Sequence, residues 1–271
     1  MERKRRTLFR AYVWKRQSIT QLAKQERRSH VWIKKQLDAL KPLPFRLLPQ
    51  KTVVAADMTF WGRGYGVCVF RSPLLKENLW WKESPFETSC IYQAGLEQLQ
   101  SEGWTISAVV IDGKRGVARI FERSGIPVQY CQFHQVKTVT KYLTRRPKTE
   151  AARELRTLTL TLKDTCEAQL ARMLTVWHER WRLFLEEKSP APHTKRGWQY
   201  THQRVKAAYR SLMTNRAYLF TYERHSELVV PKTTNTLDGM FSQIKNRLAI
   251  HRGLRRDRRY KLISEILRNS N

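Results

Sequence analysis

Two short apolar segments constrain the fold of this chain more than any other feature. TVVAADMTFW (52–61) is rich in β-forming residues, and ISAVVID (106–112) is the short, fully apolar strand found in the middle of a covered sheet. Two more strand segments and a helix ending at Gly103 lie between them, and a helix and the strand PVQYCQFH (127–134) follow. The order β-β-β-α-β-α-β predicts an α/β fold, a mixed sheet with helices on it. In this sheet, right-handed crossovers add parallel strands to three antiparallel ones.

The rest of the chain divides around this sheet. Between about residues 137 and 230 no strand pattern is convincing, and the apolar spacing is that of long amphipathic helices. We therefore predict a helix-turn-helix region (1–40), a proline-containing linker (41–51), the first part of the sheet domain (52–136), an all-helical insertion (137–231), and a closing helix with a basic tail (232–271).

The N-terminal segment SITQLAKQERRSHVWIKKQL (18–37) has the spacing of a helix-turn-helix. Ala23 would be the small residue where the helices cross, and Ser29 would cap the second helix. Arg27 stands where such units usually carry glycine, so the match is imperfect. The alternative is a plain helical hairpin with a solvated basic face. If the segment binds DNA, the contacts are expected from Ser29, Trp32, Lys34 and Lys35.

The charge of the chain points to a polyanionic partner. Lys and Arg number 52 against 23 Asp and Glu, which gives a formal charge of +29. Such a charge exceeds what solubility needs and favours nucleic acid as the partner.

No membrane partner is expected, because no apolar run is long enough to span a bilayer. MERKRR is not a signal peptide, and four unpaired-looking cysteines (68, 90, 131 and 166) favour a reducing, cytoplasmic location.

Three aspartates are candidate metal ligands. Asp57 lies inside the first strand, Asp112 ends the fourth, and Asp238 begins the helix TLDGMFSQIKNRL. If the first and fourth strands are neighbours, Asp57 and Asp112 converge, and a divalent cation would relieve their repulsion. Each aspartate also has a simpler reading, in which Asp57 caps a bulge, Asp112 begins a turn and Asp238 satisfies helix amides. The ordered set of three in a basic chain favours catalysis.

At these residues the sequence resembles the Mutator-type transposases of bacterial insertion sequences, which belong to the DDE superfamily and have an RNase H-like catalytic domain. The resemblance rests on AADMTFWG, VVIDGKRG, YCQFHQVK and TTNTLDGMFSQIKNRLAIHRGL and covers roughly residues 50–255. It implies that Asp57, Asp112 and Asp238 are the catalytic acids and hold two Mg²⁺ or Mn²⁺ ions. It also places Cys131 and His134 beside the active site and makes Lys245 a basic residue facing the DNA. The third acid of the family is usually Glu, so Asp238 is a departure.

The activity expected from this resemblance is DNA transposition. The protein would bind terminal inverted repeats in double-stranded DNA, cleave the element's ends with metal-activated water and transfer strands, as a homodimer or larger assembly at the bacterial nucleoid. The alternatives are a decayed or domesticated DNA-binding regulator, and an RNase H-like nuclease without strand transfer. Further DNA contacts are expected from Arg247, Arg252, Arg255 and Arg256.

Two weaker features have more than one interpretation. Cys131-x-x-His134 could be half of a zinc site, although no second close pair of ligands follows it. The segment GWQYTHQR (197–204) mixes aromatic and basic residues, so it could stack on a DNA end or simply pack against helices.

Overall fold

The structure is a computed structural model that describes residues 2–40, 47–251 and 253–269. It divides into two compact units. The first comprises the N-terminal helices, residues 57–105 and the C-terminal helices. The second comprises residues 51–56 and 106–235, so strand β1 contributes to both. Of the predicted linker, residues 41–46 lie outside the described residues, and Lys51 already belongs to β1.

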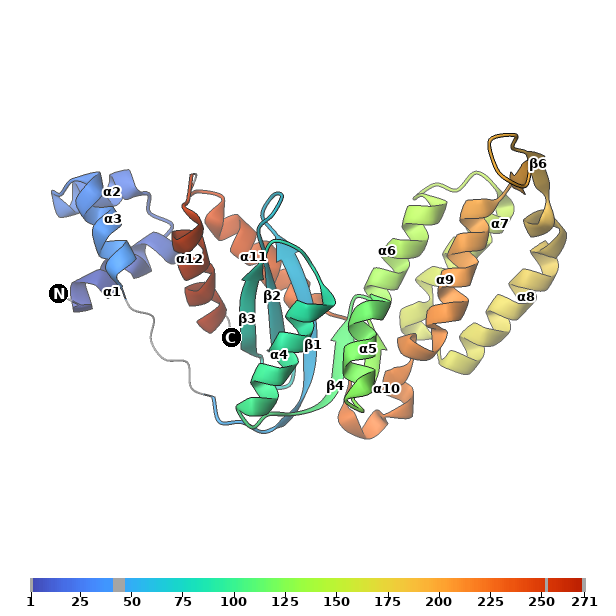
Figure 1. The fold of residues 1–271 in the computed structure, drawn as a ribbon, viewed down its shortest axis with the longest axis horizontal. Helices are drawn as coiled ribbons and strands as arrows, with labels where there is room; N and C mark the ends of the chain where they lie inside the picture. Colours follow the sequence, from blue (N-terminus) through green and yellow to red (C-terminus); the bar gives the residue numbers. More distant parts are fainter. Residues whose placement is uncertain (1, 41–46, 252, 270–271) are drawn as a thin grey trace. The chain divides into compact units, whose positions relative to one another are not determined.

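One mixed five-stranded sheet has the order β3-β2-β1-β4-β5 (Figure 1). Its strands are β1 (Lys51–Phe60), β2 (Gly66–Ser72), β3 (Glu77–Ser84), β4 (Thr105–Ile111) and β5 (Val128–Tyr130). The β2 and β3 strands are antiparallel, whereas β4 and β5 are parallel. The predicted α/β class, the mixed sheet and the adjacency of the first and fourth strands are therefore confirmed.

Helices α4 (Ser89–Ser101) and α5 (Arg115–Arg123) follow the predicted order. The α4 helix packs on β2 and β3 through Gly95, where an added Cβ would lie 2.8 Å from the Phe70 ring. The prediction for residues 127–134 is wrong at its end, because the strand stops at Tyr130 and helix α6 (Gln132–Leu143) begins two residues later. Cys131 is the N-cap of α6, so Cys131 and His134 lie at a helix start and not in a strand.

The N-terminal region folds as three helices, α1 (Glu2–Val13), α2 (Ile19–Glu26) and α3 (His30–Ala39). Ser18 and Gln21 form a capping box on α2, and the Ser29 hydroxyl accepts from the Trp32 amide at the start of α3. Arg27 adopts a left-handed conformation with φ of 51° as the C-cap of α2. The turn that glycine usually makes is thus formed here by arginine, at a conformational cost that the packed helices offset.

The chain after Asp238 forms two helices, α11 (Asn235–Leu248) and α12 (Arg256–Arg268). The predicted basic tail therefore contains a second helix, which the sequence analysis does not anticipate. The α12 helix buries Leu262, Ile263, Ile266 and Leu267, and Trp81 Nε1 of β3 donates to Ser264 Oγ at 3.0 Å. Five of the seven Lys and Arg residues after α11 therefore lie on a packed helix.

An ion pair fastens the N-terminal helices to α12. Arg258 is 8% exposed, and its guanidinium donates to both carboxylate oxygens of Asp38 at 2.8 and 2.6 Å. Lys261 Nζ donates to the backbone carbonyls of Leu37 and Asp38 at the end of α3, where the helix dipole favours a cation. The side-chain hydrogen bond from Arg258 lowers the pKa of Asp38 below its usual value.

The second unit carries the insertion. Its helices are α7 (Glu150–Leu160), α8 (Glu167–Glu186), α9 (Gln203–Leu219) and α10 (Thr221–Arg224), with short 3₁₀ turns at Leu162–Asp164 and Ser226–Leu228. The predicted all-helical insertion is wrong in one place, because strands β6 (Lys188–Pro190) and β7 (Trp198–Tyr200) form a hairpin between α8 and α9 (Figure 1). Three-residue strands are too short to show a period-2 pattern. Within the described residues, no helix is long and apolar enough to cross a membrane.

We predict that Arg258→Ala lowers the free energy of unfolding by about 1–2 kcal/mol, because it removes two hydrogen bonds to a half-exposed carboxylate. The pKa of Asp38 is depressed in the folded protein, so the stabilisation is present at neutral pH and is lost as pH falls through that lowered pKa. Urea denaturation at pH 7 and in acid measures the difference. Exposed Arg63→Ala is the matched control. Equal stability of Arg258→Ala and the wild type at pH 7 would contradict the role of this pair.

Candidate metal centre

Asp57 is a carboxylate inside a buried strand. Residues Val53 to Ala56 of β1 are fully buried, and Asp57 itself is 8% exposed. Its Oδ1 accepts from the Met58 amide at 2.7 Å. Burial of an ionised carboxylate is unfavourable unless hydrogen bonds or cations compensate. The position therefore suits a ligand of a bound cation better than a structural residue of the sheet.

Glu87 is a second carboxylate near Asp57 in the first unit, and it is not among the metal ligands predicted from the sequence. It lies just before α4, and the phenol of Tyr92 donates to Glu87 Oε1 at 2.8 Å. Burial raises the pKa of Tyr92 well above its usual value, with smaller contributions from the neighbouring Cys68, Glu87 and Asp57. Burial likewise raises the pKa of the Cys68 thiol, and the charge of Asp57 adds to that effect. The sequence signal was weak, because an acid preceding a helix is common.

Asp238 lies in the first turn of α11, as predicted. The apolar stripe of the helix is buried, with Leu237, Phe241, Ile244 and Leu248 all at most 7% exposed. Packing of the stripe holds the helix and leaves Asp238 partly exposed at its side. Lys245 is exposed two turns later, with its Nζ 5.9 Å from the centre of the Trp61 ring.

Asp112 and the Cys131–His134 pair belong to the second unit. Asp112 directly follows β4, and Cys131 N donates to the carbonyl of Ile111 at 2.7 Å. The Cys131 thiol accepts from the amide and hydroxyl of Thr234 at 3.3 and 3.4 Å. Burial raises the pKa of Cys131, but hydrogen bonds from His134 and Thr234 outweigh it, so the thiol pKa is lowered overall.

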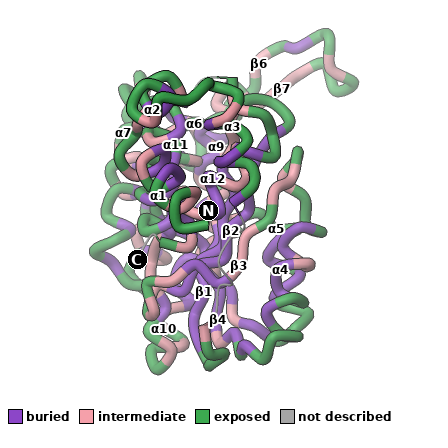
Figure 2. The backbone as a smooth tube through the Cα atoms, turned by 90° about the vertical axis from the view of Figure 1, so that its left-hand side faces the viewer, coloured by how far each residue is buried: buried purple, intermediate pink, exposed green. Residues whose placement is uncertain are grey.

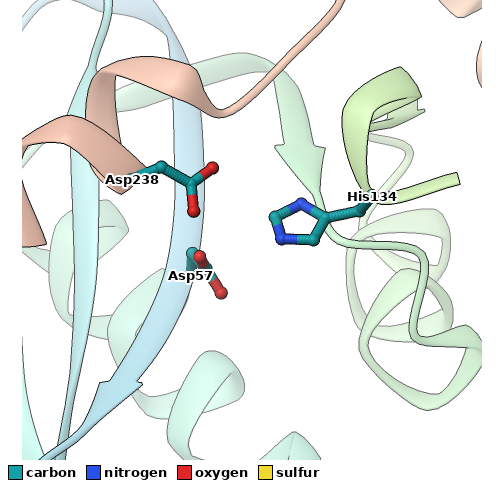
Figure 3. Close-up of side chains that lie close together, drawn as sticks. All are labelled: Asp57, His134 and Asp238. Atoms are coloured by element: carbon teal, nitrogen blue, oxygen red, sulfur yellow. The ribbon is translucent and has the colours of Figure 1, made fainter. Parts of the chain in front are cut away.

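Two groups of candidate metal ligands share Asp57. In one, ligand atoms of Asp57, His134 and Asp238 all lie within 4.8 Å of one another (Figure 3). In the other, the same holds for Asp57, Glu87 and Asp112. The predicted acids Asp112 and Asp238 thus belong to different groups. Asp112 lies with Asp57 and Glu87, and Asp238 lies with Asp57 and His134.

The donor sets differ in the cation they suit. Three carboxylates provide the hard oxygen ligands that Mg²⁺ and Mn²⁺ prefer, whereas the imidazole of His134 in the other set also suits transition metals such as Zn²⁺. Cys131 is in neither group, and no group among the described residues has the two tight Cys/His pairs of a structural zinc site. The residues present therefore fit divalent cations bound mainly by oxygen.

The expected DNA-contacting residues lie in several places of the first unit. On α3, Lys34 and Lys35 are exposed, and Trp32 is flanked by the cations of Lys4 and Arg28, each 5.6 Å from its ring. The Ser29 side chain is a helix cap. The guanidinium of Arg247 lies 4.7 Å from the centre of the Trp14 ring. Arg255 is exposed, and Arg256 forms an ion pair with Glu83 at 3.2 Å. Arg252 lies outside the described residues.

In comparisons with known proteins, no family model matches the chain, and no curated protein matches it. The chemical interpretation of the centre therefore depends on the residues themselves.

We predict that Mn²⁺ raises the thermal unfolding temperature of metal-free protein and that Asp57→Asn abolishes most of this gain, because Asp57 belongs to both ligand groups. A ligand at 100 times its Kd stabilises by about 2.7 kcal/mol, which is a shift of a few degrees for a chain of this size. Glu87→Gln and Asp238→Asn should each remove only part of the gain. Exposed Asp164→Asn is the control, and an undiminished gain in Asp57→Asn would refute the assignment.

Proposed function

We propose that this protein is a metal-dependent transposase of the DDE type, similar to the Mutator-type enzymes of insertion sequences. The observation that carries the proposal is Asp57, a buried strand carboxylate shared by two groups of candidate ligands. The high positive charge and the three N-terminal helices support DNA as the substrate.

In this proposal Asp57, Asp112 and Asp238 hold divalent cations, with Glu87 and His134 completing the two sets. Two such ions, when bound, stabilise the attacking and leaving oxygens of a phosphodiester displacement. Asp57 is held rigidly by the strand and Asp238 by the packed stripe of α11, which limits the movement of the carboxylates. Preorganised ligands of this kind lower the reorganisation needed during the reaction.

Other residues would bind and orient the DNA. Lys245 lies on the same helix as Asp238, and seven residues bring it back to within about 20° of the same direction. It would attract the DNA end through a phosphate. The α3 helix, with Lys34 and Lys35 exposed, would read the inverted repeat.

Water would cleave the end, and the freed 3′-hydroxyl would attack a second DNA, so no Ser or Tyr nucleophile is needed. Joining two ends would require at least two copies of the chain.

The proposal is tested with a plasmid that carries the DNA flanking this gene on both sides. We expect Mg²⁺-dependent cleavage at matching inverted repeats, followed by joined products. Asp57→Asn and Asp112→Asn should lose at least 100-fold in cleavage but keep DNA binding, because a repulsive charge near phosphate is removed. Cleavage without joined products would instead indicate a nuclease, and binding without any cleavage would indicate a regulator.

Asp238 allows a sharper prediction. Asp238→Asn should abolish cleavage without unfolding the chain, since the buried stripe of α11 is unchanged. Asp238→Glu displaces the carboxylate by about 1 Å, so activity should change by several-fold or more, upward if the pocket has room for the longer side chain. Lys245→Ala should weaken binding of the DNA end with little effect on the metal concentration required. Normal cleavage by Asp238→Asn would show that this residue only stabilises the start of α11.

A further inference from the structure

The β6–β7 hairpin of the insertion presents two aromatic rings on one face. Because residues two apart in a strand share a face, Trp198 and Tyr200 of β7 lie on the same side. Their cross-strand partners are Pro190 and Lys188 of β6. The two rings meet edge to face, with centroids 5.4 Å apart, and both side chains are half-buried. Figure 2 shows the hairpin as a mostly exposed and intermediate segment.

Cations surround these rings. Lys188 Nζ lies 4.2 Å from the centre of the Trp198 ring, and Lys206 Nζ lies 3.3 Å from that of Tyr200. Lys195 and Arg196 are exposed in the turn between the strands. Residues 188–206 carry five Lys or Arg and no Asp or Glu. The nearest carboxylate along the chain, Glu187, lies at the base of the hairpin, where it pairs with His202 at 2.9 Å. The rings and the turn therefore form a predominantly cationic surface.

Contacts beyond the strand pairing support the hairpin, whose strands are short. A two-stranded hairpin is marginal by itself in water. Here Ala191 N donates to the Gly197 carbonyl at 2.8 Å, and the hydroxyls of Ser189 and Thr201 lie 2.6 Å apart. At the base, His202 stacks on Phe184 with centroids 3.5 Å apart. The rings and cations are therefore preorganised, which reduces the entropy lost on binding a ligand.

Aromatic faces beside cations are the features that bind single strands of nucleic acid. Bases stack on the rings, and the cations contact the phosphates. The bases of an intact duplex are stacked on each other and offer no free face, so this surface suits a strand with unpaired bases. We propose that the β6–β7 hairpin binds unpaired nucleotides of DNA, with Trp198 and Tyr200 stacking on bases and Lys195 and Arg196 contacting phosphates. The choice of DNA over RNA rests on the proposed function.

The test compares two DNA probes in metal-free buffer, so that no cleavage occurs. One is a blunt duplex, and the other is the same duplex with an unpaired 3′ extension that carries 2-aminopurine. We expect Trp198→Ala to weaken binding of the extended probe about 5- to 150-fold, the range for loss of one base–aromatic stack, and to leave binding of the blunt duplex unchanged. Wild-type protein should quench the 2-aminopurine, and Trp198→Phe should retain most of the affinity and quenching.

A second variant separates stacking from charge. Lys195→Ala with Arg196→Ala should weaken binding of both probes and reduce its salt dependence. Thermal unfolding identifies any variant that loses the fold. The proposal is overturned if folded Trp198→Ala binds the extended probe as the wild type does, or if it weakens both probes equally.

The outcome is distinguishable from that of the proposed function. If the hairpin variants lose binding of the extended probe but the wild type never cleaves DNA, this inference stands and the transposase proposal is refuted. If the wild type cleaves DNA and the hairpin variants bind the extended probe normally, the transposase proposal stands and this inference is refuted. Preference for an RNA extension over the DNA extension would overturn the partner assigned here.

Discussion

The burial of a carboxylate in the central strand is the constraint on which this structure most depends. Asp57 follows four fully buried residues of β1 and is itself only 8% exposed. A lone charge there would destabilise the sheet, so its surroundings must supply compensation. The neighbouring side chains include further acids, which makes the local charge more negative in a chain of net charge +29. In the proposed function, bound cations would offset this repulsion and would connect the stability of the sheet to the chemistry.

The positive charge of the chain serves more than one purpose. Arg258 is buried against Asp38, and Lys261 covers the last carbonyls of α3, so part of the charge fastens the N-terminal helices to α12. Other cations remain exposed, including Lys34 and Lys35 on α3 and Lys195 and Arg196 in the hairpin turn. Part of the basic content is therefore structural, and only the exposed cations could serve the proposed DNA partner.

The local sequence determined the elements whose signals extend over many residues. The order of the strands, the apolar stripe of α11 and the cap at Ser29 follow from periodicity and short-range hydrogen bonds. The convergence of Asp57 and Asp112 followed from the adjacency of the first and fourth strands. These features depend on neighbours in the chain or on simple rules of sheet topology, so a single sequence suffices for them.

Tertiary structure decided the rest. Glu87 joins the acids because α4 packs on β2 and β3, which the sequence around residue 87 does not reveal. The α12 helix and the β6–β7 hairpin were missed because strongly charged or short segments carry weak periodicity. The hairpin forms only because cross-strand pairs and the stack at its base add to a marginal local preference. Interactions between residues far apart in the chain settled the place of Glu87 and the packing of α12, and cross-strand contacts settled the hairpin.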